Sequence, residues 1–228
     1  MDLDIVMLQC GFPELTVRAI QSIKATSMAR IILVDNGSDA ADVKTALDEL
    51  RSWDTLIRNH ENLGFAKAVN QGIRASTAPY VCVQNNDTVV HRDALQNMLD
   101  WLEADKTLGL IGPLTNSANT EQRVSGPEAM TGGYRYTSGL VAFFCTVIPR
   151  SVIDDVGPLS EEYGLGYGED DDYCIRLRRA GYLLGIAHDA YVHHDHHTTY
   201  RALFGDDGIR EMGEQGLALL REKYGQTA

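Results

Sequence analysis

The stretch PYVCVQNNDT, residues 79–88, runs from an apolar segment into two asparagines and an aspartate. Its apolar part has the length and composition of a buried strand, and the Asn and Asp residues after it favour a turn. Similar apolar runs precede it, each separated from the next by apolar residues at helical spacing. This alternation predicts an α/β fold, with a mostly parallel central sheet and helices on both faces. The earlier runs are residues 3–8, 30–35 and 55–59.

The second half of the chain is less regular. Its pattern predicts a strand at 108–113, a long surface loop at 114–137 that could close over a ligand, and a long strand at 138–149. A helix at 168–181, two short strands (LLGIA and AYVHH) and a closing helix at 206–225 complete the expected elements. No linker interrupts the chain, so the sequence predicts a single domain over residues 1–228.

Composition narrows the classes of function. The 228 residues carry 20 − 32 = −12 formal charges, which disfavours a nonspecific grip on nucleic acid phosphates. We find no apolar run near 18 residues and no basic-then-apolar leader, and therefore expect a cytoplasmic protein without an integral membrane segment. The four cysteines lie at no spacing typical of metal or redox sites, and we expect them to be reduced core residues.

Five polar blocks follow one another in an informative order. They are VDNGS (34–38), NLGFAKAVNQG (62–72), QNNDT (84–88), GEDDDYCIRLRRAG (168–181) and VHHDHHTTY (192–200). In this order they resemble the family 2 glycosyltransferases, inverting nucleotide-sugar enzymes of the GT-A fold, and most closely the small rhamnosyltransferase-like members. The resemblance covers roughly residues 3–200. It implies a nucleotide-sugar-binding half at 1–105, an acceptor and catalytic half at 106–200, and a C-terminal helix at 201–228.

The first two blocks concern the donor. An aspartate just beyond a strand can accept hydrogen bonds from a base or a ribose, although an Asx turn is the plainer interpretation of Asp35. A helix that opens at Gly64 offers amides to phosphate, with Lys67 and Arg74 as possible counter-charges; an ordinary helix capped by Asn62 is the alternative. The resemblance implies that Asp35 contacts the nucleotide base. The full set expected to bind the donor is Asp35, Asn36, Asn62, Gly64, Lys67, Asn70 and Asn86.

The third and fifth blocks concern a metal. The family's DXD element, whose carboxylates hold Mn²⁺ or Mg²⁺ against the donor diphosphate, reads Asn85-Asn86-Asp87 here, so Asp87 alone supplies a carboxylate. One carboxylate is enough in principle when phosphates and water complete the shell. The resemblance implies a late histidine ligand, His194, with His193 in reserve. Two further histidines, His196 and His197, stand where related sequences have small residues, and the sequence offers no reason for them.

The fourth block concerns the acceptor. Acids in the first turn of a helix suit the macrodipole, and Asp172 with Arg176 makes a favourable i, i+4 pair, so a purely structural role is possible. The resemblance implies instead that Asp170 is the general base, with Glu169 and Asp172 orienting the site and Asp171 the least suited. We expect the helix N-terminus to keep this carboxylate ionised. The side chains of Tyr136 and Arg150 are further candidates to face the acceptor.

These observations predict a metal-dependent inverting glycosyltransferase that uses a nucleoside-diphosphate sugar, with UDP- or dTDP-linked donors favoured. The hydroxyl acceptor stays open among glycan, lipid, protein and modified nucleic acid. A nucleotidyltransferase of similar fold is an alternative, but LQCGFPELTVR lacks the Gly-rich basic loop of that class. A non-catalytic nucleotide-sugar or carbohydrate-binding module would need a broken acid cluster. Residues 201–228 could form a homo-oligomer interface.

Overall fold

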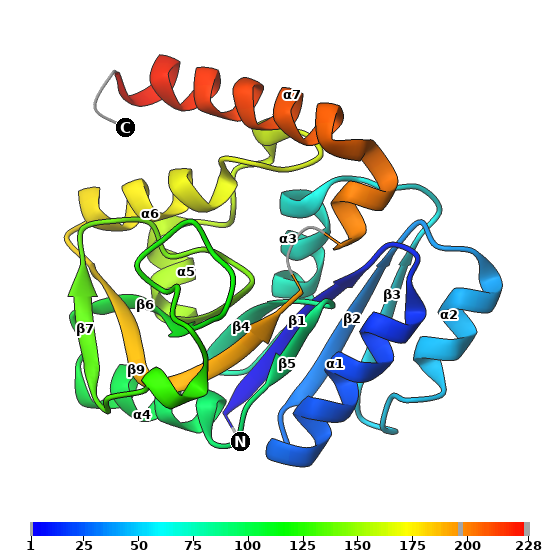
Figure 1. The fold of residues 1–228 in the computed structure, drawn as a ribbon, viewed down its shortest axis with the longest axis horizontal. Helices are drawn as coiled ribbons and strands as arrows, with labels where there is room; N and C mark the ends of the chain where they lie inside the picture. The colour runs from blue at the N-terminus through cyan, green and yellow to red at the C-terminus, as the bar shows by residue number, and fades with distance from the viewer. Residues whose placement is uncertain (1, 196–197, 226–228) are drawn as a thin grey trace.

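The computed structural model describes residues 2–195 and 198–225 of the chain. Its first half is a parallel sheet whose strands alternate with helices, as predicted (Figure 1). The strand order β3-β2-β1-β4 places the first strand between the second and fourth, so that their carboxyl ends meet at one edge. The elements are β1 (Leu3–Gln9), α1 (Pro13–Thr26), β2 (Arg30–Asn36), α2 (Ala40–Leu47), β3 (Thr55–Asn59), α3 (Phe65–Ala75) and β4 (Tyr80–Asn85).

The sheet then continues with antiparallel neighbours. Strand β8 (Cys145–Pro149) pairs antiparallel with both β4 and β6 (Leu108–Leu114). On its other side β6 runs parallel to β9 (Leu183–His194), which also receives β5 (Thr88–Val90) and β7 (Tyr134–Thr137). The sheet is therefore mixed. Because β8 hydrogen-bonds to β4, the two halves of the chain share one sheet.

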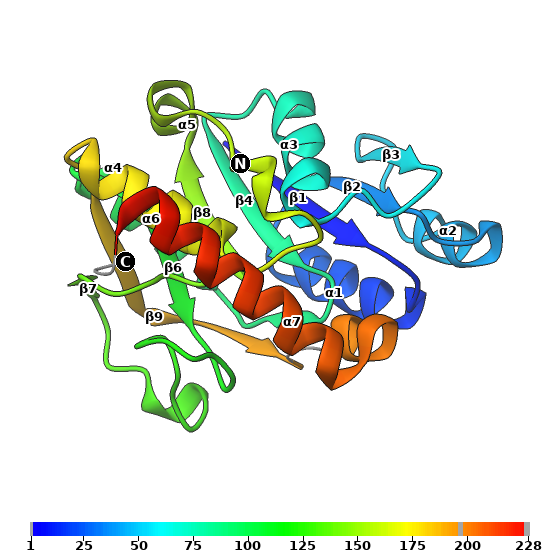
Figure 2. The same cartoon turned by 90° about the horizontal axis from the view of Figure 1, so that it is seen from above.

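Two apolar clusters cover the two faces of this sheet. Side chains of α1, α2 and α4 (Ala94–Ala104) pack on one face, and those of α3, α5 (Arg150–Val156) and α6 (Glu169–Arg179) pack on the other. Figure 2 shows α1 and α3 on opposite sides of β1. Fully buried strands such as β2 must have both faces covered, which explains its unbroken apolar run.

Helix α7 (Thr198–Tyr224) runs along one side of the molecule, over α3 and α6 (Figure 1). It breaks at Gly205, whose φ of 65° and ψ of 176° lie outside the helical region. Its second part packs against the glycine-rich turn before α6. A Cβ at Gly216 would lie 2.1 Å from the Tyr167 carbonyl oxygen, so only glycine permits this contact.

Several predicted elements differ in the structure. The strand expected at 138–149 begins only at Cys145, because residues 138–144 turn along the cavity described below. The two short strands expected late in the chain are one strand, β9. Within the expected 114–137 loop lies strand β7, and the fully buried Gln122 ties the loop to the core through the Pro113 carbonyl and the Ala142 amide. The four cysteines are free, but Cys10 is only half-buried.

Candidate active site

Two adjoining cavities lie beyond the carboxyl ends of β1, β2 and β4. The larger has a volume of about 270 Å³ and reaches from Asp87 and His194 to the N-terminus of α6. The smaller, of about 70 Å³, lies over the ends of β1 and β2. Four residues line both cavities, so the two form one continuous site. These shared residues are Phe65, Asn85, Asp87 and Tyr200.

The smaller cavity contains the polar ends of β1 and β2. Gln9 lines it and is fully buried, and neither polar atom of its side chain has a hydrogen-bond partner among the described residues. Its register partner across the sheet is Asp35. One carboxylate oxygen of Asp35 accepts the Ser38 amide, which is the expected Asx turn, while the other lies 3.6 Å from Nε of Arg58. Asp35 is fully buried and does not line either cavity, so of this pair only Gln9 faces the site.

An amide network supports the same cavity. Asn36 is buried and donates to Asn62 Oδ1, while its own Oδ1 accepts from Asn59 and from the Leu63 amide. Asn62 lines the cavity, and so does Asn86, whose Nδ2 donates to Thr16. The structure therefore brings these three asparagines of the predicted donor set together.

The entry of α3 does not present free amides as expected. A Cβ at Gly64, where φ is 87°, would lie 2.0 Å from the Gly164 carbonyl oxygen, so the helix start packs directly on the turn before α6. The Gly64 amide donates to Asn62 and the Phe65 amide to Leu165. These two donors are already satisfied within the protein.

Three other predicted donor contacts also lie away from the cavities. Lys67 and Arg74 are exposed and are not lining residues. Asn70 is buried, but its amide bridges the backbone of Leu159 and the side chain of Glu161. It holds α3 to the segment before α6 and does not face the site.

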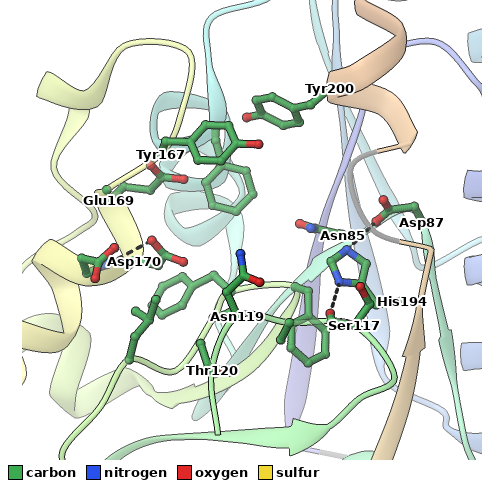
Figure 3. Close-up of a pocket in the computed structure, with 18 residues that line it drawn as sticks. Asn85, Asp87, Ser117, Asn119, Thr120, Tyr167, Glu169, Asp170, His194 and Tyr200 are labelled. Carbon is green, nitrogen blue, oxygen red and sulfur yellow. Dashed lines mark hydrogen bonds and ion pairs between the residues drawn. The ribbon is translucent and has the colours of Figure 1, made fainter. Parts of the chain in front are cut away.

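Asp87 and His194 face each other at one end of the larger cavity (Figure 3). His194 Nδ1 lies 3.3 Å from the Ser117 carbonyl oxygen, an arrangement that favours the proton on Nδ1. The ring stacks on Phe144, with centroids 5.0 Å apart. Its Nε2 then lies 3.3 Å from Asp87 Oδ1. When the ring is neutral, the lone pair of Nε2 points at the carboxylate oxygen. A cation bound between these two atoms would stabilise this arrangement.

This pair fits the divalent metal that the sequence resemblance implies. Neighbouring ligands in an octahedral shell lie about 3 Å apart, close to the observed separation. The Ser117 carbonyl orients the imidazole as carbonyls and carboxylates commonly do at metal-binding histidines. Among residues 2–195 and 198–225, no group of three or more His, Cys, Asp or Glu side chains gathers as a metal cluster. Phosphate oxygens and water would have to supply the remaining ligands.

His193 does not share this position. It projects from the opposite face of β9, is about half exposed, and contacts Asp195, which also pairs with Arg18. Successive side chains of a strand point to opposite faces, so only one of two adjacent histidines can reach the cavity. His196 and His197 lie outside the described residues.

The other end of the larger cavity is acidic. Glu169, Asp170 and Asp171 line it from the first turn of α6, and in Figure 3 Asn119 lies between them and the Asp87–His194 end. Burial and the neighbouring Asp171 raise the pKa of Asp170 to about 7, although backbone amides, including that of Phe143, oppose the rise. Burial and Asp170 likewise raise the pKa of Glu169. We expected the helix N-terminus to keep Asp170 ionised. That expectation was wrong, because the desolvation of these crowded carboxylates raises the pKa by more than the helix N-terminus lowers it.

Asp172 points away from this cavity. It accepts from Arg176 Nε, Lys223 Nζ and the Tyr224 hydroxyl at 2.7, 2.8 and 2.7 Å. Although burial opposes it, these donors lower the pKa of Asp172. Asp172 therefore anchors α7 to α6, which is the structural interpretation of the acid run, and it is not a lining residue.

The two candidates for acceptor contacts lie elsewhere. Arg150 donates to the carbonyl groups of Ile73 and Ser76 at the end of α3. Tyr136 projects from β7, where its hydroxyl donates to Asp105. Neither lines a cavity.

Other lining residues were not predicted. Most of them come from the 114–144 region, the turn before α6 and the start of α7, whereas Gln9 and Asn85 are the last residues of β1 and β4. The aromatic content of GYG and TTY is the only hint available from the sequence for Tyr167 and Tyr200. The unpredicted residues include Gln9, Asn85, Ser117, Asn119, Thr120, Phe143, Phe144, Tyr167 and Tyr200.

The site is thus a strand-end pocket with one carboxylate–imidazole pair and one acidic helix start. The model of the family described as "Glycosyl transferase family 2" matches residues 5–150, more than half of the chain. The chain belongs to this family of glycosyltransferases. Family membership confirms the class of enzyme predicted from the five sequence blocks.

One curated relative is the pre-mycofactocin glycosyltransferase of Mycobacterium tuberculosis. It is 31% identical over 185 residues, which are 75% of this chain and 38% of the relative. The chain thus spans well under half the length of this relative. The similarity supports glycosyl transfer as the class of reaction.

Solved structures share the fold. The chain is similar to GalNAc-T7 crystallised with UDP, GalNAc and Mn²⁺, with a TM-score of 0.71, 15% identity and coverage of 84% of this chain and 43% of that one. It is also similar to the mannosyltransferase PcManGT from Pyrobaculum calidifontis in complex with GDP-Man and Mn²⁺, with a TM-score of 0.70, 17% identity and coverage of 95% and 64%. These likenesses confirm the predicted GT-A fold. Within the described residues, no helix combines the length and hydropathy of a membrane span.

Proposed function

We propose that this protein is a metal-dependent inverting glycosyltransferase that moves a sugar from a nucleoside-diphosphate donor to an acceptor hydroxyl. One observation carries the proposal: a single cavity holds the Asp87–His194 pair at one end and the Asp170 carboxylate at the other. The first end suits the leaving diphosphate, and the second suits the attacking hydroxyl. The sugar would occupy the space between them.

At the diphosphate end, Asp87 and His194 would hold Mn²⁺ or Mg²⁺. The metal would supply neutralisation of the charge on the diphosphate as the glycosidic bond to it breaks. Asn85 on the wall shared by the two cavities, and Asn86 on the wall of the smaller one, offer amide groups beside Asp87. These neutral amides can donate to phosphate or ribose oxygens without adding charge.

At the other end, Asp170 would accept the proton of the acceptor hydroxyl as its oxygen forms a bond to the anomeric carbon. The bond from that carbon to the diphosphate oxygen breaks in the same step. A pKa near 7 suits a general base at neutral pH, because the carboxylate is partly ionised yet basic enough to take a proton. Attack from the side opposite the leaving group inverts the anomeric centre.

The smaller cavity would hold the nucleoside. Its polar lining, with Gln9, Asn36 and Asn62, suits a base edge that carries both donors and acceptors, and UDP or dTDP is the proposed carrier. Uracil and thymine present one N–H donor flanked by two carbonyl acceptors. The Gln9 amide, which lines this cavity, can accept from the N–H and donate to a carbonyl.

Thermal shift measurement with UDP, dTDP, GDP, ADP and CDP, each with Mn²⁺ and with chelator, tests the donor end. We expect a Mn²⁺-dependent rise in Tm with UDP or dTDP. A comparable rise with GDP alone would contradict the pyrimidine assignment, and no rise with any nucleotide would contradict the donor site. NMR of the product from the matching nucleotide sugar then tests the stereochemistry: retention of the anomeric configuration would exclude direct attack assisted by Asp170.

A further inference from the structure

The acidic end of the larger cavity bears on the chemistry of the acceptor. Among the residues described by the structure, three carboxyl side chains line this end, and no lysine or arginine lines either cavity. Glu169 is 7% exposed, and its Oε2 has no hydrogen-bond partner among the described residues. The unpartnered oxygen belongs to a side chain that faces the cavity beside Tyr167 (Figure 3). It is therefore available to a ligand.

The walls around these acids are aromatic. Tyr167 and Tyr200 meet edge to face with centroids 5.5 Å apart, and the Tyr200 hydroxyl donates to the Leu165 carbonyl. A Cβ at Gly166 would lie 2.5 Å from that hydroxyl, so the glycine turn fixes the position of the ring. Phe143 adds a third ring, held edge to face against Tyr173 with centroids 5.8 Å apart. Rings fixed in this way offer large apolar surfaces at little cost in conformational entropy.

Polar groups of the opposite wall complete the pocket. Asn119 and Thr120 line it from the loop after β6, which the buried Gln122 ties to the core. Flat apolar walls with a few amide and hydroxyl groups suit a ring that carries hydroxyl groups at its edge.

We propose that the acceptor is a neutral ring compound with a free hydroxyl, bound between Tyr167 and Phe143, and that acceptors phosphorylated near that hydroxyl are excluded. The inference rests on the proposed function and specifies its second substrate. A phosphate at the acidic end would meet the acids of α6 with no lysine or arginine among the described lining residues to bind it, and such repulsion is an effective source of specificity. A sugar ring and an aryl alcohol both present this chemistry.

Saturation-transfer NMR on the full chain, with Mg²⁺ and with or without UDP, tests the proposal. The probes are methyl β-D-glucopyranoside and its 6-phosphate, and benzyl alcohol and benzyl phosphate. We expect at least one neutral probe to give a signal about five-fold or more above that of its phosphorylated partner, and the comparison of the two neutral probes identifies the source of the ring. Equal or stronger signals from the phosphorylated probes, or no signal from either neutral probe, would overturn the proposal.

Variants assign any signal to this pocket. Tyr167→Ala should abolish the signal of the neutral probe, whereas Tyr136→Ala, which removes a tyrosine on β7 outside both cavities, should leave it unchanged. In a Glu169→Gln/Asp171→Asn double variant the phosphorylated probe should gain signal. If these expectations fail while UDP still raises the Tm, the proposed acceptor class alone is refuted. If no nucleotide raises the Tm, the proposed donor site is refuted.

Discussion

His194 Nε2 lies 3.3 Å from Asp87 Oδ1, although the two side chains come from distant parts of the chain: a strand end near residue 87 and a histidine run after residue 191. The antiparallel pairing of β5 with β9 brings them together, with Thr88 opposite His194. Strand pairing thus builds a two-residue site from segments about a hundred residues apart.

If this pair holds the metal, His194→Ala should abolish the Mn²⁺-dependent rise in Tm that the nucleotide produces. The reason is that the imidazole supplies one of only two protein ligands expected there. His193→Ala is the matched control, because that side chain lies on the other face of β9 and should leave the shift intact. An unchanged shift in the His194 variant would remove it from the ligand set.

Asp170→Asn should lower the transfer rate about 100- to 10,000-fold, the range typical of a lost general base, while nucleotide binding is retained. Asp100→Asn, an exposed carboxylate of α4, serves as the control and should transfer at the wild-type rate. Rates are measured by product formation and binding by thermal shift. Full activity in the Asp170 variant would refute its role as base.

The pH profile follows from the raised pKa of Asp170. The base acts only when ionised, so kcat/KM should rise with pH and reach half its plateau near pH 7. This rising limb should be absent from the residual activity of Asp170→Asn. A profile that is flat from pH 5 to 9 in the wild type would contradict the assignment.

The Asp170 carboxyl group should lower the stability of the folded protein at alkaline pH. Its folded pKa exceeds the ordinary value of 3.8, so the folded state binds the proton more tightly than the unfolded state does. Stability contributed by this group is therefore lost as pH rises from about 4 through about 7. Accordingly, Asp170→Asn should have a higher Tm than the wild type at pH 8 and a similar one at pH 4.5, a difference that calorimetry can measure. A lower Tm than the wild type at pH 8 would contradict this account.

The glycine contact between α7 and the turn before α6 gives a packing test. Gly216→Ala would place a methyl group 2.1 Å from the Tyr167 carbonyl oxygen, which should lower the free energy of unfolding by about 1–3 kcal/mol and displace Tyr167. Gly213→Ala, in the same helix, meets no atom within 4 Å and should raise stability by up to about 1 kcal/mol. Denaturant unfolding of the two variants measures the change in the free energy of unfolding for each, and equal changes would refute the close contact.

The parallel half of the fold could be predicted from the sequence because each strand there is a short apolar run followed by a helical pattern. The antiparallel half could not be predicted as well. Apolar residues at 138–144 look like a strand, but they turn along the cavity, where Phe143 and Phe144 form walls. An apolar stretch of sequence indicates that its residues are buried, but it does not indicate whether they form a strand or line a cavity.

For the site, the family resemblance implied Asp87, His194 and Asp170, which line one cavity, but the sequence did not indicate which neighbours share that cavity. Asn70 and Asp172 belong to the same sequence blocks, yet their side chains hold α3 and α7 in place. Their partners, Leu159 and Lys223, are distant in sequence, and only the folded arrangement shows that their hydrogen bonds are already used. Gln9 was missed because a glutamine at a strand end carries no distinctive spacing.

None of the lysines and arginines in the part of the chain that the structure describes lines either cavity, and this has a kinetic consequence under the proposed function. A diphosphate that finds no permanent counter-charge binds well only as a complex with its cation. Turnover should then follow the concentration of the chelated donor, so that excess free nucleotide sugar does not saturate the enzyme.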